Sequence, residues 1–554
     1  MRAIFGTISI FAIALTAVFA QDSPAPAGEA LIDGSVVNKM SGAPVKRAHV
    51  MFYQLATAGA EEVYADTDAG GRYTAQLQAG QYRVWVERPG FSRLNYGASS
   101  TTGEGKILTL APGQELHDVS FRISPLSAIS GHVLDEDGDP VQGAGVQVLK
   151  FSYATGKRML LSVSGTSSND RGEYRAFGLP PGRYFLLVTQ LGAPLSKPLS
   201  RGMLVADAQD FFAPLYYPGV LDFAEATPLV LGEGADSQDI DIRLRRTRVF
   251  TLRGRLLSPA ENFADSQLAV TLAPRDGDTA SYINRAAATM DRLSGRFEFH
   301  NVAPGSYELV AAQLYRGQAL SGRLPIEVTS AGHGEEISLP VTAGSEITGT
   351  VELEGAAPDA LRGTRVLLTE TEALALGPQP SAQVEVGGGF RLSGVTPGVW
   401  QVSISPLPKG AWLKDLILDA REIPSGIVDL VSPSRGPFRI VLASNGAQLS
   451  GTATRDGQPS RATVVLAPAA ADLRSSASNY LSISTDDQGN FAFSGVRPGS
   501  YKLFAFEDVE PYAWLDPDFL KSVDSLGQDV TLGEGEAMQK QVTAISSDTA
   551  PPNP

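Results

Sequence analysis

The acidic segment Asp135-Glu136-Asp137-Gly138-Asp139 has the clearest potential for chemistry in this sequence. Alternating carboxylates can supply the oxygen ligands that Ca²⁺ prefers. The spacing of an EF-hand loop and its distal Glu are missing, however, and the segment lies where two strands of one domain must turn. Two interpretations therefore stay open: a plain hairpin turn, which we favour, and a weak calcium site.

The other reactive residue types form no recognisable catalytic or metal-binding arrangement. The His residues stand singly, without an HExxH or HxH pair, which favours places on the surface or in turns; they are His49, His117, His132, His300 and His333. No Ser lies in a G-x-S-x-G elbow, and the absence of Cys excludes disulfides, thiolate metal sites and Cys nucleophiles. We therefore predict that this is not an enzyme and has no catalytic residues, cofactor or metal.

Aromatic residues gather in two segments that read as loop insertions. The first contributes Phe211, Phe212, Tyr216 and Tyr217, and the second contributes Tyr512 and Trp514. Flat rings can stack on sugars, and exposed apolar patches often mark interaction sites. The alternative, which we favour, is that these rings fold back and seal a domain end or a domain junction. These six residues are the candidate ligand-binding residues of the sequence.

Length, charge and composition limit the classes of fold and function that are possible for this chain. The chain has 554 residues, enough for about three to five domains. Its net charge of −15 argues against nucleic acid and against anionic lipid, because both require a basic face. With 43% hydrophobic and 19% charged residues the chain can build cores. The 57 Gly and 36 Pro residues indicate many turns.

The N-terminal segment is typical of a secretory signal peptide. Arg2 supplies a positive start, an apolar run follows, and small residues precede a cleavage site at Ala20. We expect a signal peptide at 1–20 and a Pro/Ala linker at 21–28. Because no later apolar run reaches about 18 residues, we predict no transmembrane anchor in the mature chain.

One signature recurs five times and predicts paired strands. A small turn precedes an aromatic residue that opens an alternating strand, with steps of 102, 123, 93 and 101 residues between the aromatics, which are Tyr82, Tyr184, Tyr307, Trp400 and Tyr501. Pro followed by Gly in this turn indicates a type II turn with positive φ at Gly. Nine to ten residues upstream, a Gly turn usually led by Asp runs into another aromatic, as in Asp68 to Tyr73.

Each copy also opens and closes with an alternating strand. The opening strands are centred on a Gly, which usually marks a bulge or a close backbone approach; these are Gly34, Gly131, Gly254, Gly349 and Gly451. Strands of period two with turns every 8–12 residues predict β-sandwiches. There are only two helix candidates, residues 205–212 and the segment Asp516 to Lys521. In the second, Asp516 can cap a helix and Pro517 can begin it.

The predicted fold is all-β, a tandem array of about five antiparallel Ig-like or prealbumin-like β-sandwich domains after the signal peptide. The expected sandwiches span 29–124, 125–246, 247–342, 343–444 and 445–546, followed by a tail at 547–554, and the second carries the aromatic insertion. The boundaries leave very short linkers, so we expect neighbouring domains to be stiffly stacked.

Together, the opening G-x-V, the DxxGxY turn and the PGxY strand resemble the carboxypeptidase regulatory-like family. The resemblance covers roughly 29–546 and is strongest in ISGHVLDEDGDPVQGAGVQV and DRGEYRAFGLPPGRYFLLV. The fourth copy departs from it, with no Asp before Gly389 and with Trp400 in place of Tyr, and the first copy has Ala79 where Pro is usual. The resemblance implies prealbumin-like, carbohydrate-binding-like or collagen-adhesin-like sandwiches that are accessory rather than catalytic. A Lys–Asn isopeptide bond is not expected, because the opening strands hold no inward Lys.

The functional prediction is a non-catalytic exported repeat protein. We expect it to bind carbohydrate or to act as an adhesive or spacer at the cell envelope, in the periplasm, at the outer membrane or outside the cell. One alternative is a scaffold or assembly partner of an outer-membrane or surface complex. Another is an accessory to a hydrolase or peptidase. The expected partner is a polysaccharide or an envelope protein.

Overall fold

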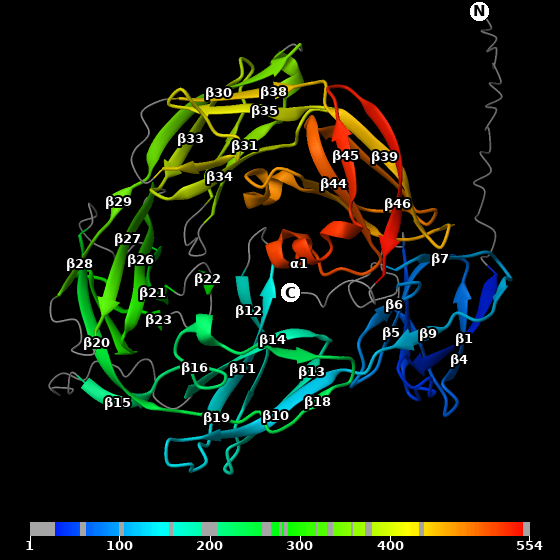
Figure 1. The fold of residues 1–554 in the computed structure, drawn as a ribbon, viewed down its shortest axis with the longest axis horizontal. Coiled ribbons are helices and arrows are strands. Elements are labelled where there is room, and N and C mark those ends of the chain that lie inside the picture. Colours follow the sequence, from blue (N-terminus) through cyan, green and yellow to red (C-terminus); the bar gives the residue numbers. More distant parts are fainter. Residues whose placement is uncertain are drawn as a thin grey trace, which may run out of the picture.

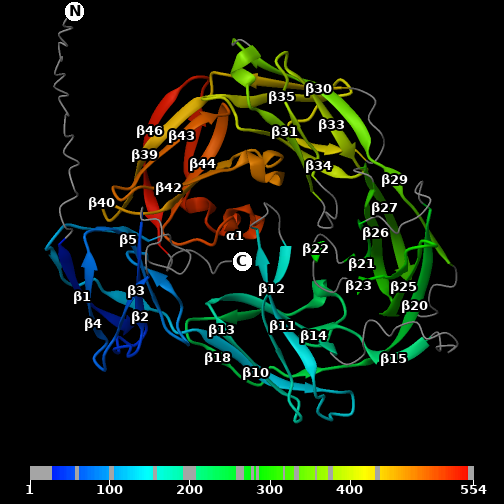
Figure 2. The ribbon, with the colours of Figure 1, turned by 180° about the vertical axis from the view of Figure 1, so that it is seen from behind.

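The computed structural model shows a series of all-β sandwiches arranged in a ring (Figures 1 and 2). It describes residues 28–55, 62–98, 105–153, 159–190, 208–257, 267–275, 280–281, 286–315, 318–329, 336–355, 358–371, 379–430 and 437–546. The expected signal peptide, most of the linker that follows it, the tail and His333 lie outside these residues. No helix in the described ranges is long and apolar enough to cross a membrane.

Five large apolar clusters form the cores of the array. They lie between Ala30 and Ile123, Ile129 and Leu244, Leu252 and Val341, Ile347 and Leu442, and Ala447 and Ala544. We name the corresponding segments units 1 to 5, by the elements that each contains. The all-β sandwich fold predicted from the sequence is confirmed, whereas the domain boundaries at single-residue precision stay a proposal.

The elements of each unit follow in chain order. Unit 1 contains β1 (Glu29–Asn38), β2 (His49–Gln54), β3 (Val63–Asp66), β4 (Arg72–Gln78), β5 (Gly80–Glu87), β6 (Leu94–Asn95), β7 (Ile107–Leu110), β8 (Glu115–Leu116) and β9 (Phe121–Ile123). Unit 2 contains β10 (Ser127–Leu134), β11 (Ala144–Ser152), β12 (Met159–Ser167), β13 (Glu173–Leu179), β14 (Gly182–Gln190), β15 (Ala208–Phe212), β16 (Leu215–Tyr216), η1 (Phe223–Glu225), β17 (Leu229–Leu231), β18 (Asp236–Ser237) and β19 (Ile242–Arg243). Unit 3 contains β20 (Arg246–Leu257), β21 (Gln267–Pro274), β22 (Ala280–Ser281), β23 (Ala286–Ala287), β24 (Thr289–Asp291), β25 (Arg296–Val302), β26 (Gly305–Tyr315), β27 (Gln318–Val328), β28 (Ile337–Pro340) and β29 (Thr342–Ala343).

Units 4 and 5 complete the series. Unit 4 contains β30 (Ser345–Glu354), η2 (Pro358–Leu361), β31 (Arg365–Glu370), β32 (Ser381–Gln383), β33 (Gly389–Val395), β34 (Val399–Ser405), β35 (Trp412–Leu418), β36 (Arg421–Glu422), β37 (Ile427–Asp429) and β38 (Phe438–Ala443). Unit 5 contains β39 (Ala447–Arg455), β40 (Gln458–Pro459), β41 (Thr463–Pro468), η3 (Leu473–Ser475), η4 (Ala477–Asn479), β42 (Leu481–Ser484), β43 (Asn490–Val496), β44 (Gly499–Phe506), η5 (Ala513–Leu515), α1 (Pro517–Ser522), η6 (Asp524–Leu526), β45 (Gln528–Leu532) and β46 (Ala537–Ile545).

Every unit repeats the same strand pairing. The opening strand pairs antiparallel with the strand that follows the upstream Gly turn, as β10 does with β13. It also pairs in parallel with the closing strand, as in β10–β19 and β39–β46. A second sheet holds the strand of the PGxY signature, which pairs antiparallel in β11–β14 and β41–β44. The sheets are therefore mainly antiparallel, and parallel pairing of the opening strand joins the beginning of each unit to its end.

The Gly at the centre of each opening strand allows the closing strand to approach, as the sequence predicts. A methyl group at Gly131 would overlap the carbonyl oxygen of Ile240 in the segment that leads into β19. Tyr174, which pairs with Gly131 across β10 and β13, donates its hydroxyl to that carbonyl over 2.6 Å. Burial raises the pKa of the Tyr174 phenol, so the group remains a neutral donor. One Gly, one aromatic ring and one carbonyl thus lock the two ends of a unit together.

The aromatic residue of the PGxY signature fixes the turn that precedes it. In all five units its polar ring atom donates a hydrogen bond to the carbonyl of the residue four positions earlier. The distances are 2.9 Å for Tyr82, 2.6 Å for Tyr184, 2.9 Å for Tyr307, 3.0 Å for Trp400 and 2.6 Å for Tyr501. The predicted positive φ is wrong for Gly182, Gly305 and Gly398, whereas Gly80 and Gly499 have φ values of 156° and 157°, far from the value of about 80° that a type II turn requires. The first three Gly residues instead begin or precede a strand beside the ring, where an added methyl group would be in ordinary van der Waals contact with the aromatic side chain.

The upstream Gly turn has the geometry that the sequence predicts. Its Gly adopts a left-handed conformation, with a φ of 73° at Gly172 and at Gly489. The side chain that organises the turn in unit 2 is Asn169, whose Oδ1 accepts from the backbone N–H groups of Arg171 and Glu173. In unit 5 the carboxylate of Asp486 accepts in the same way. In both copies the organising residue precedes by one the Asp that we expected to lead the turn.

The acidic segment of unit 2 forms a turn. The Asp135 carboxylate accepts from the backbone N–H groups of Asp137, at 3.0 Å, and Asp139, at 2.9 Å. The backbone N–H of Asp135 also donates to the carbonyl of Asp139. Asp135 therefore has a structural role at this turn, and the calcium interpretation has no support among the described residues, where no group of three or more acidic or His residues could hold a metal ion.

One of the two helix candidates is confirmed. Asp516 caps α1 and accepts from the N–H groups of Asp518 and Phe519, and Pro517 opens the helix. The other candidate, residues 205–212, is wrong for its described part, because Ala208–Phe212 forms strand β15. The strand is specified by its partner, since β15 pairs with β20 of the next unit. Tertiary pairing here overrides local sequence preference.

Neighbouring units are joined by direct contacts rather than by free linkers. Between units 2 and 3 the contact consists of two strand pairs, β15–β20 and β12–β22. Between units 1 and 2 the Lys39 ammonium pairs with Glu233 at 2.7 Å. Between units 3 and 4 the guanidinium of Arg323 pairs with the buried Glu370. Between units 4 and 5 the N–H of Gly446 donates to the carbonyl of Gly410.

Unit 5 closes the ring by returning to units 1 and 2. The segment after β44, residues 507–527, carries α1 and lies beside unit 2 in both views (Figures 1 and 2). Leu515 of this segment packs against the outer apolar cluster of unit 2, and Tyr153 donates its hydroxyl to Asp516. The Lys150 ammonium pairs with Glu510 at the same contact. Arg461 of unit 5 donates to the carbonyl of Gly105 in unit 1.

The sheets that meet at this closing contact are buried on both faces. In unit 2 one face of β11 and β14 packs into the main core, and the opposite face forms the cluster of Leu149, Phe151 and Phe185. Unit 5 has the same two-sided burial around Phe504 and Phe506. Strands buried on both faces read as continuous apolar runs rather than as alternations. The run Phe185-Leu186-Leu187-Val188 is such a signal.

Candidate functional site

The six aromatic residues singled out from the sequence do not form one surface. Tyr216 is 2% exposed and Trp514 is 5% exposed, each within an apolar cluster. Tyr217 and Phe212 pack against the core of unit 2, and the side chain of Phe211 lies outside the described set. Tyr512 is 41% exposed beside Trp514, with ring centroids 5.6 Å apart. Burial of Tyr216 and Trp514 is what the sealing alternative predicts, and ligand binding by the set stays a prediction.

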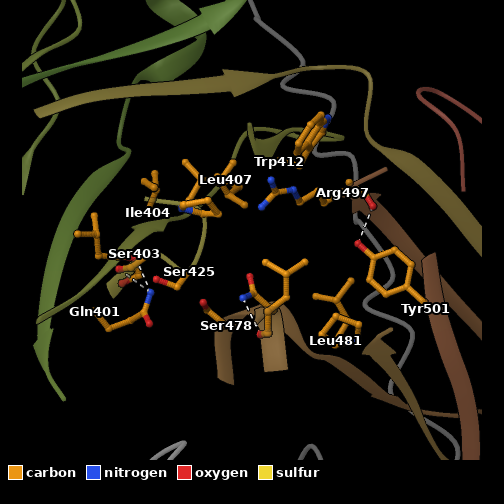
Figure 3. Close-up of a pocket in the computed structure, with 18 residues that line it drawn as sticks. Gln401, Ser403, Ile404, Leu407, Trp412, Ser425, Ser478, Leu481, Arg497 and Tyr501 are labelled. Carbon is orange, nitrogen blue, oxygen red and sulfur yellow. Dashed lines mark hydrogen bonds between the residues drawn. The ribbon is translucent and has the colours of Figure 1, made fainter. Parts of the chain in front are cut away.

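A pocket between units 4 and 5 is a better candidate for a ligand site than the six aromatic residues. Its volume is about 230 Å³. Figure 3 shows side chains from both units facing it. Unit 4 contributes β34, the loop that follows it and the start of β35, whereas unit 5 contributes the η3–η4 segment and the PGxY turn. The lining residues are Gln401, Val402, Ser403, Ile404, Leu407, Trp412, Leu413, Pro424, Ser425, Gly426, Pro468, Leu473, Ser478, Asn479, Leu481, Gly495, Arg497 and Tyr501.

Hydrogen bonds across the unit junction hold one side of the pocket in place. The Gln401 amide nitrogen donates to the carbonyls of Val402, at 3.1 Å, and Gly426, at 3.0 Å. Its amide oxygen accepts from the hydroxyl of Ser476 in unit 5 at 2.7 Å. The Ser476 hydroxyl is also 2.9 Å from that of Ser478. Both ends of Gln401 are thus used, and the two units meet here in a defined orientation.

Two aromatic residues and an arginine form the other side. The Trp412 indole N–H donates to the Asn445 side-chain carbonyl over 3.2 Å, which fixes the plane of the ring. The Arg497 guanidinium lies 5.9 Å from the centroid of Trp412, within the range of a cation–π contact. The Tyr501 hydroxyl donates to the Arg497 carbonyl and holds the backbone from which this side chain extends. Figure 3 shows Arg497 directed toward the other lining side chains.

Among the residues that the structure describes, Arg497 is the sole charged one that lines the pocket. No carboxylate in the described part of the chain forms a salt bridge with it. The other lining groups are apolar side chains, hydroxyls and amides. Ligand sites are usually concave and mainly apolar with a few placed polar groups. The pocket can therefore bind a small polar molecule, and it offers no carboxylate or imidazole for acid–base chemistry.

The local sequence patterns do not predict this pocket. Tyr501 and the turn that carries Arg497 belong to a recognised motif, but Trp412 lies in an unremarked segment before β35. The pocket depends on the angle between two units, which no local pattern encodes. A weak signal was available: Ala469 to Tyr480 lengthens unit 5 between two strands, and such insertions often carry function.

His49, His117 and His132 lie on the surface, as the sequence predicts, whereas His300 is half-buried near Glu298. His49, His117 and His132 each pair with an Asp. No group of three or more His, Asp or Glu residues in the described ranges could hold a metal ion. In one of the His–Asp pairs, His117 Nδ1 lies 2.5 Å from Asp33 Oδ2. This pair joins β1 to the closing segment of unit 1.

The Asp33–His117 pair predicts a measurable titration. The hydrogen bond to Asp33 raises the pKa of His117 above its ordinary value of 6.5, and the same bond lowers the pKa of Asp33. Because the pKa of His117 is raised in the folded state, its contribution to stability is complete below pH 6.5 and is lost as the pH rises through the folded pKa. Titration of His117 by NMR should give a midpoint above 6.5, and Asp33→Asn should lower it. An unchanged midpoint in that variant would contradict the assignment.

Comparison with known proteins places the first two units in a family. A family model described as the carboxypeptidase regulatory-like domain matches residues 32–122 and 128–201. This confirms the resemblance that the motifs of these units indicate. No curated protein matches the sequence.

Solved structures similar to parts of the chain include pilins. The minor pilin GBS52 of Streptococcus agalactiae is 12% identical, with 40% of this chain and 96% of that chain covered and a TM-score of 0.21. The shaft pilin SpaA of Lactobacillus rhamnosus GG is 11% identical, with 40% and 98% covered and a TM-score of 0.19. The Bacillus anthracis TIE protein is 10% identical, with 92% and 73% covered and a TM-score of 0.14.

Proposed function

We propose that this chain, which has carboxypeptidase regulatory-like domains at units 1 and 2, is a non-catalytic exported protein. In this proposal it binds a saccharide in the pocket between units 4 and 5. The observation that carries the proposal is the composition of that pocket. A buried indole, a phenol, hydroxyls and amides surround a concave space, and these groups combine apolar faces with hydrogen-bonding partners as a sugar ring requires.

The size of the pocket favours a short ligand segment. Its volume of about 230 Å³ is below the range of roughly 300–1,000 Å³ typical of drug-sized ligands. One sugar unit, at a chain end or within a polysaccharide, suits this space better than a whole oligosaccharide. Cell-envelope adhesion through a polysaccharide follows from this interpretation, and the periplasm, the outer surface and the medium are all compatible locations.

Filling the pocket tests the proposal. Ser478 is exposed at the mouth of the pocket, so Ser478→Trp should place an indole in the space without disturbing a core. We expect the intact chain to retain members of a glycan array and Ser478→Trp to lose at least tenfold in affinity for them by calorimetry. The matched control is Ser475→Trp, on the same segment but outside the lining. Equal affinity of both variants would place the saccharide elsewhere.

A second candidate function is a scaffold for an envelope complex. The strand pairs that join units 2 and 3, together with the closed ring, favour a fixed frame for other proteins. Recovery of one envelope protein with the intact chain, with no glycan retained on an array, would support this candidate. An accessory role beside a hydrolase or peptidase remains the third alternative.

A further inference from the structure

Arg497 gives the pocket a feature that a site for neutral sugars does not need. The chain as a whole has a net charge of −15, and yet the one charged group in the lining of this pocket is a cation. A guanidinium that is partly removed from water costs free energy unless it is paired. In the described residues most buried or half-buried cations do have a carboxylate partner, as Arg323 has Glu370 and Lys150 has Glu510.

We propose that the pocket selects an anionic sugar unit, whose carboxylate or other acidic group pairs with the Arg497 guanidinium. This inference rests on the proposed function and specifies its ligand class. A guanidinium presents several N–H donors in a planar fork that matches the two oxygens of a carboxylate. A cation–π contact with the Trp412 ring takes up none of the guanidinium N–H donors in a hydrogen bond, so these donors remain available to a ligand.

The backbone around Arg497 is held in place, so the cation is positioned before any ligand arrives. Its carbonyl accepts the Tyr501 hydroxyl at 2.6 Å, and Trp412 beneath it is oriented by Asn445. Preorganisation reduces the ordering cost of binding. The hydroxyls of Ser403 and Ser478 and the amide of Asn479 line the same space, where sugar hydroxyls would lie once the acidic group reaches Arg497.

The test compares acidic and neutral forms of one saccharide. A galacturonic acid oligomer and its methyl ester share the same sugar rings and hydroxyls, and esterification removes the negative charge by adding one methyl group at each carboxyl, so the pair tests the contribution of the anion. Calorimetry with the intact chain should show at least tenfold tighter binding of the acid. A sulfated galactan oligomer in parallel distinguishes a carboxylate from a sulfate as the anionic group.

Two variants assign the preference to Arg497. Arg497→Gln should reduce affinity for the acid at least tenfold and leave the methyl ester nearly unaffected, because only the charged contact is removed. The control is Arg421→Gln in β36, which removes the same charge from an exposed place outside the pocket and should leave both affinities unchanged. Unchanged circular dichroism would confirm that Arg497→Gln folds.

The outcomes separate this inference from the proposed function. Equal binding of acid and ester by the intact chain, abolished by Ser478→Trp, would overturn the inference and keep the saccharide pocket. Failure of every saccharide to bind would overturn both. An acid preference that survives Arg497→Gln would move the anion site away from this residue and overturn the inference alone.

Discussion

Glu510→Lys is expected to open the ring. Glu510 is 24% exposed and its partner Lys150 is 14% exposed, so the pair lies in a mostly buried contact between units 5 and 2. The variant would set two ammonium groups against each other where water has little access. Breaking a buried pair costs about 3–5 kcal/mol. Small-angle scattering should then show a larger radius of gyration, while circular dichroism should keep its strand signal because each unit has its own core.

Two further variants make this prediction specific. The exchanged pair Lys150→Glu with Glu510→Lys restores opposite charges and should restore the compact dimensions. Glu354→Lys is the matched control, since Glu354 pairs with Lys414 in a more exposed contact within unit 4. It should leave the radius of gyration unchanged. Native dimensions for Glu510→Lys would show that other contacts of residues 507–527, such as that of Tyr153 with Asp516, are sufficient to close the ring.

Gly131→Ala is expected to weaken the contact between the opening and closing strands of unit 2. The added methyl group would meet the carbonyl of Ile240, which is part of the backbone and cannot turn aside as a side chain could. Overpacking costs about 1–3 kcal/mol, occasionally more, and we expect the upper end because the parallel pairing of β10 with β19 must shift. The hydrogen bond from Tyr174 to the same carbonyl would be strained as well.

The measurement must resolve one unit among five. A single free energy of unfolding is poorly defined for a chain of several domains. Hydrogen exchange followed by mass spectrometry should show faster exchange in peptides of β10, β13 and β19 and native exchange in unit 4. The control is Gly165→Ala in β12 of the same unit, where the nearest atom to a new methyl lies 3.8 Å away. Equal exchange in both variants would refute the close-approach argument.

Much of the fold could be predicted because its determinants are local. The Gly of each opening strand, the turn Gly with left-handed backbone and the aromatic of each PGxY turn act within one unit, and they recur at a spacing that the sequence shows. The type II turn failed for a physical reason, since the ring of Tyr184 and its hydrogen bond to Pro180 decide the shape of that turn. The turn preference of Pro and Gly alone does not take the packing of that ring into account.

The ring and the pocket could not be predicted in the same way. Both depend on contacts between residues of different units, such as Ser476 with Gln401 and Tyr153 with Asp516. Strand β15 shows the same limit, because residues that suggested a helix become a strand when β20 offers an edge. The burial of both faces of the sheets around Phe185 and Phe504 is indicated by continuous apolar runs. An alternating pattern of apolar and polar residues does not predict it.

The closed arrangement also has a mechanical consequence. Because units 1 and 5 are neighbours, tension applied across the series would not be carried along five domains in line. It would first load the contacts of Arg461 with Gly105 and of Glu510 with Lys150, which are non-covalent. When they yield, the molecule would lengthen in one step while every sandwich stays folded. In the proposed envelope role, such a chain would be short at rest and long under load.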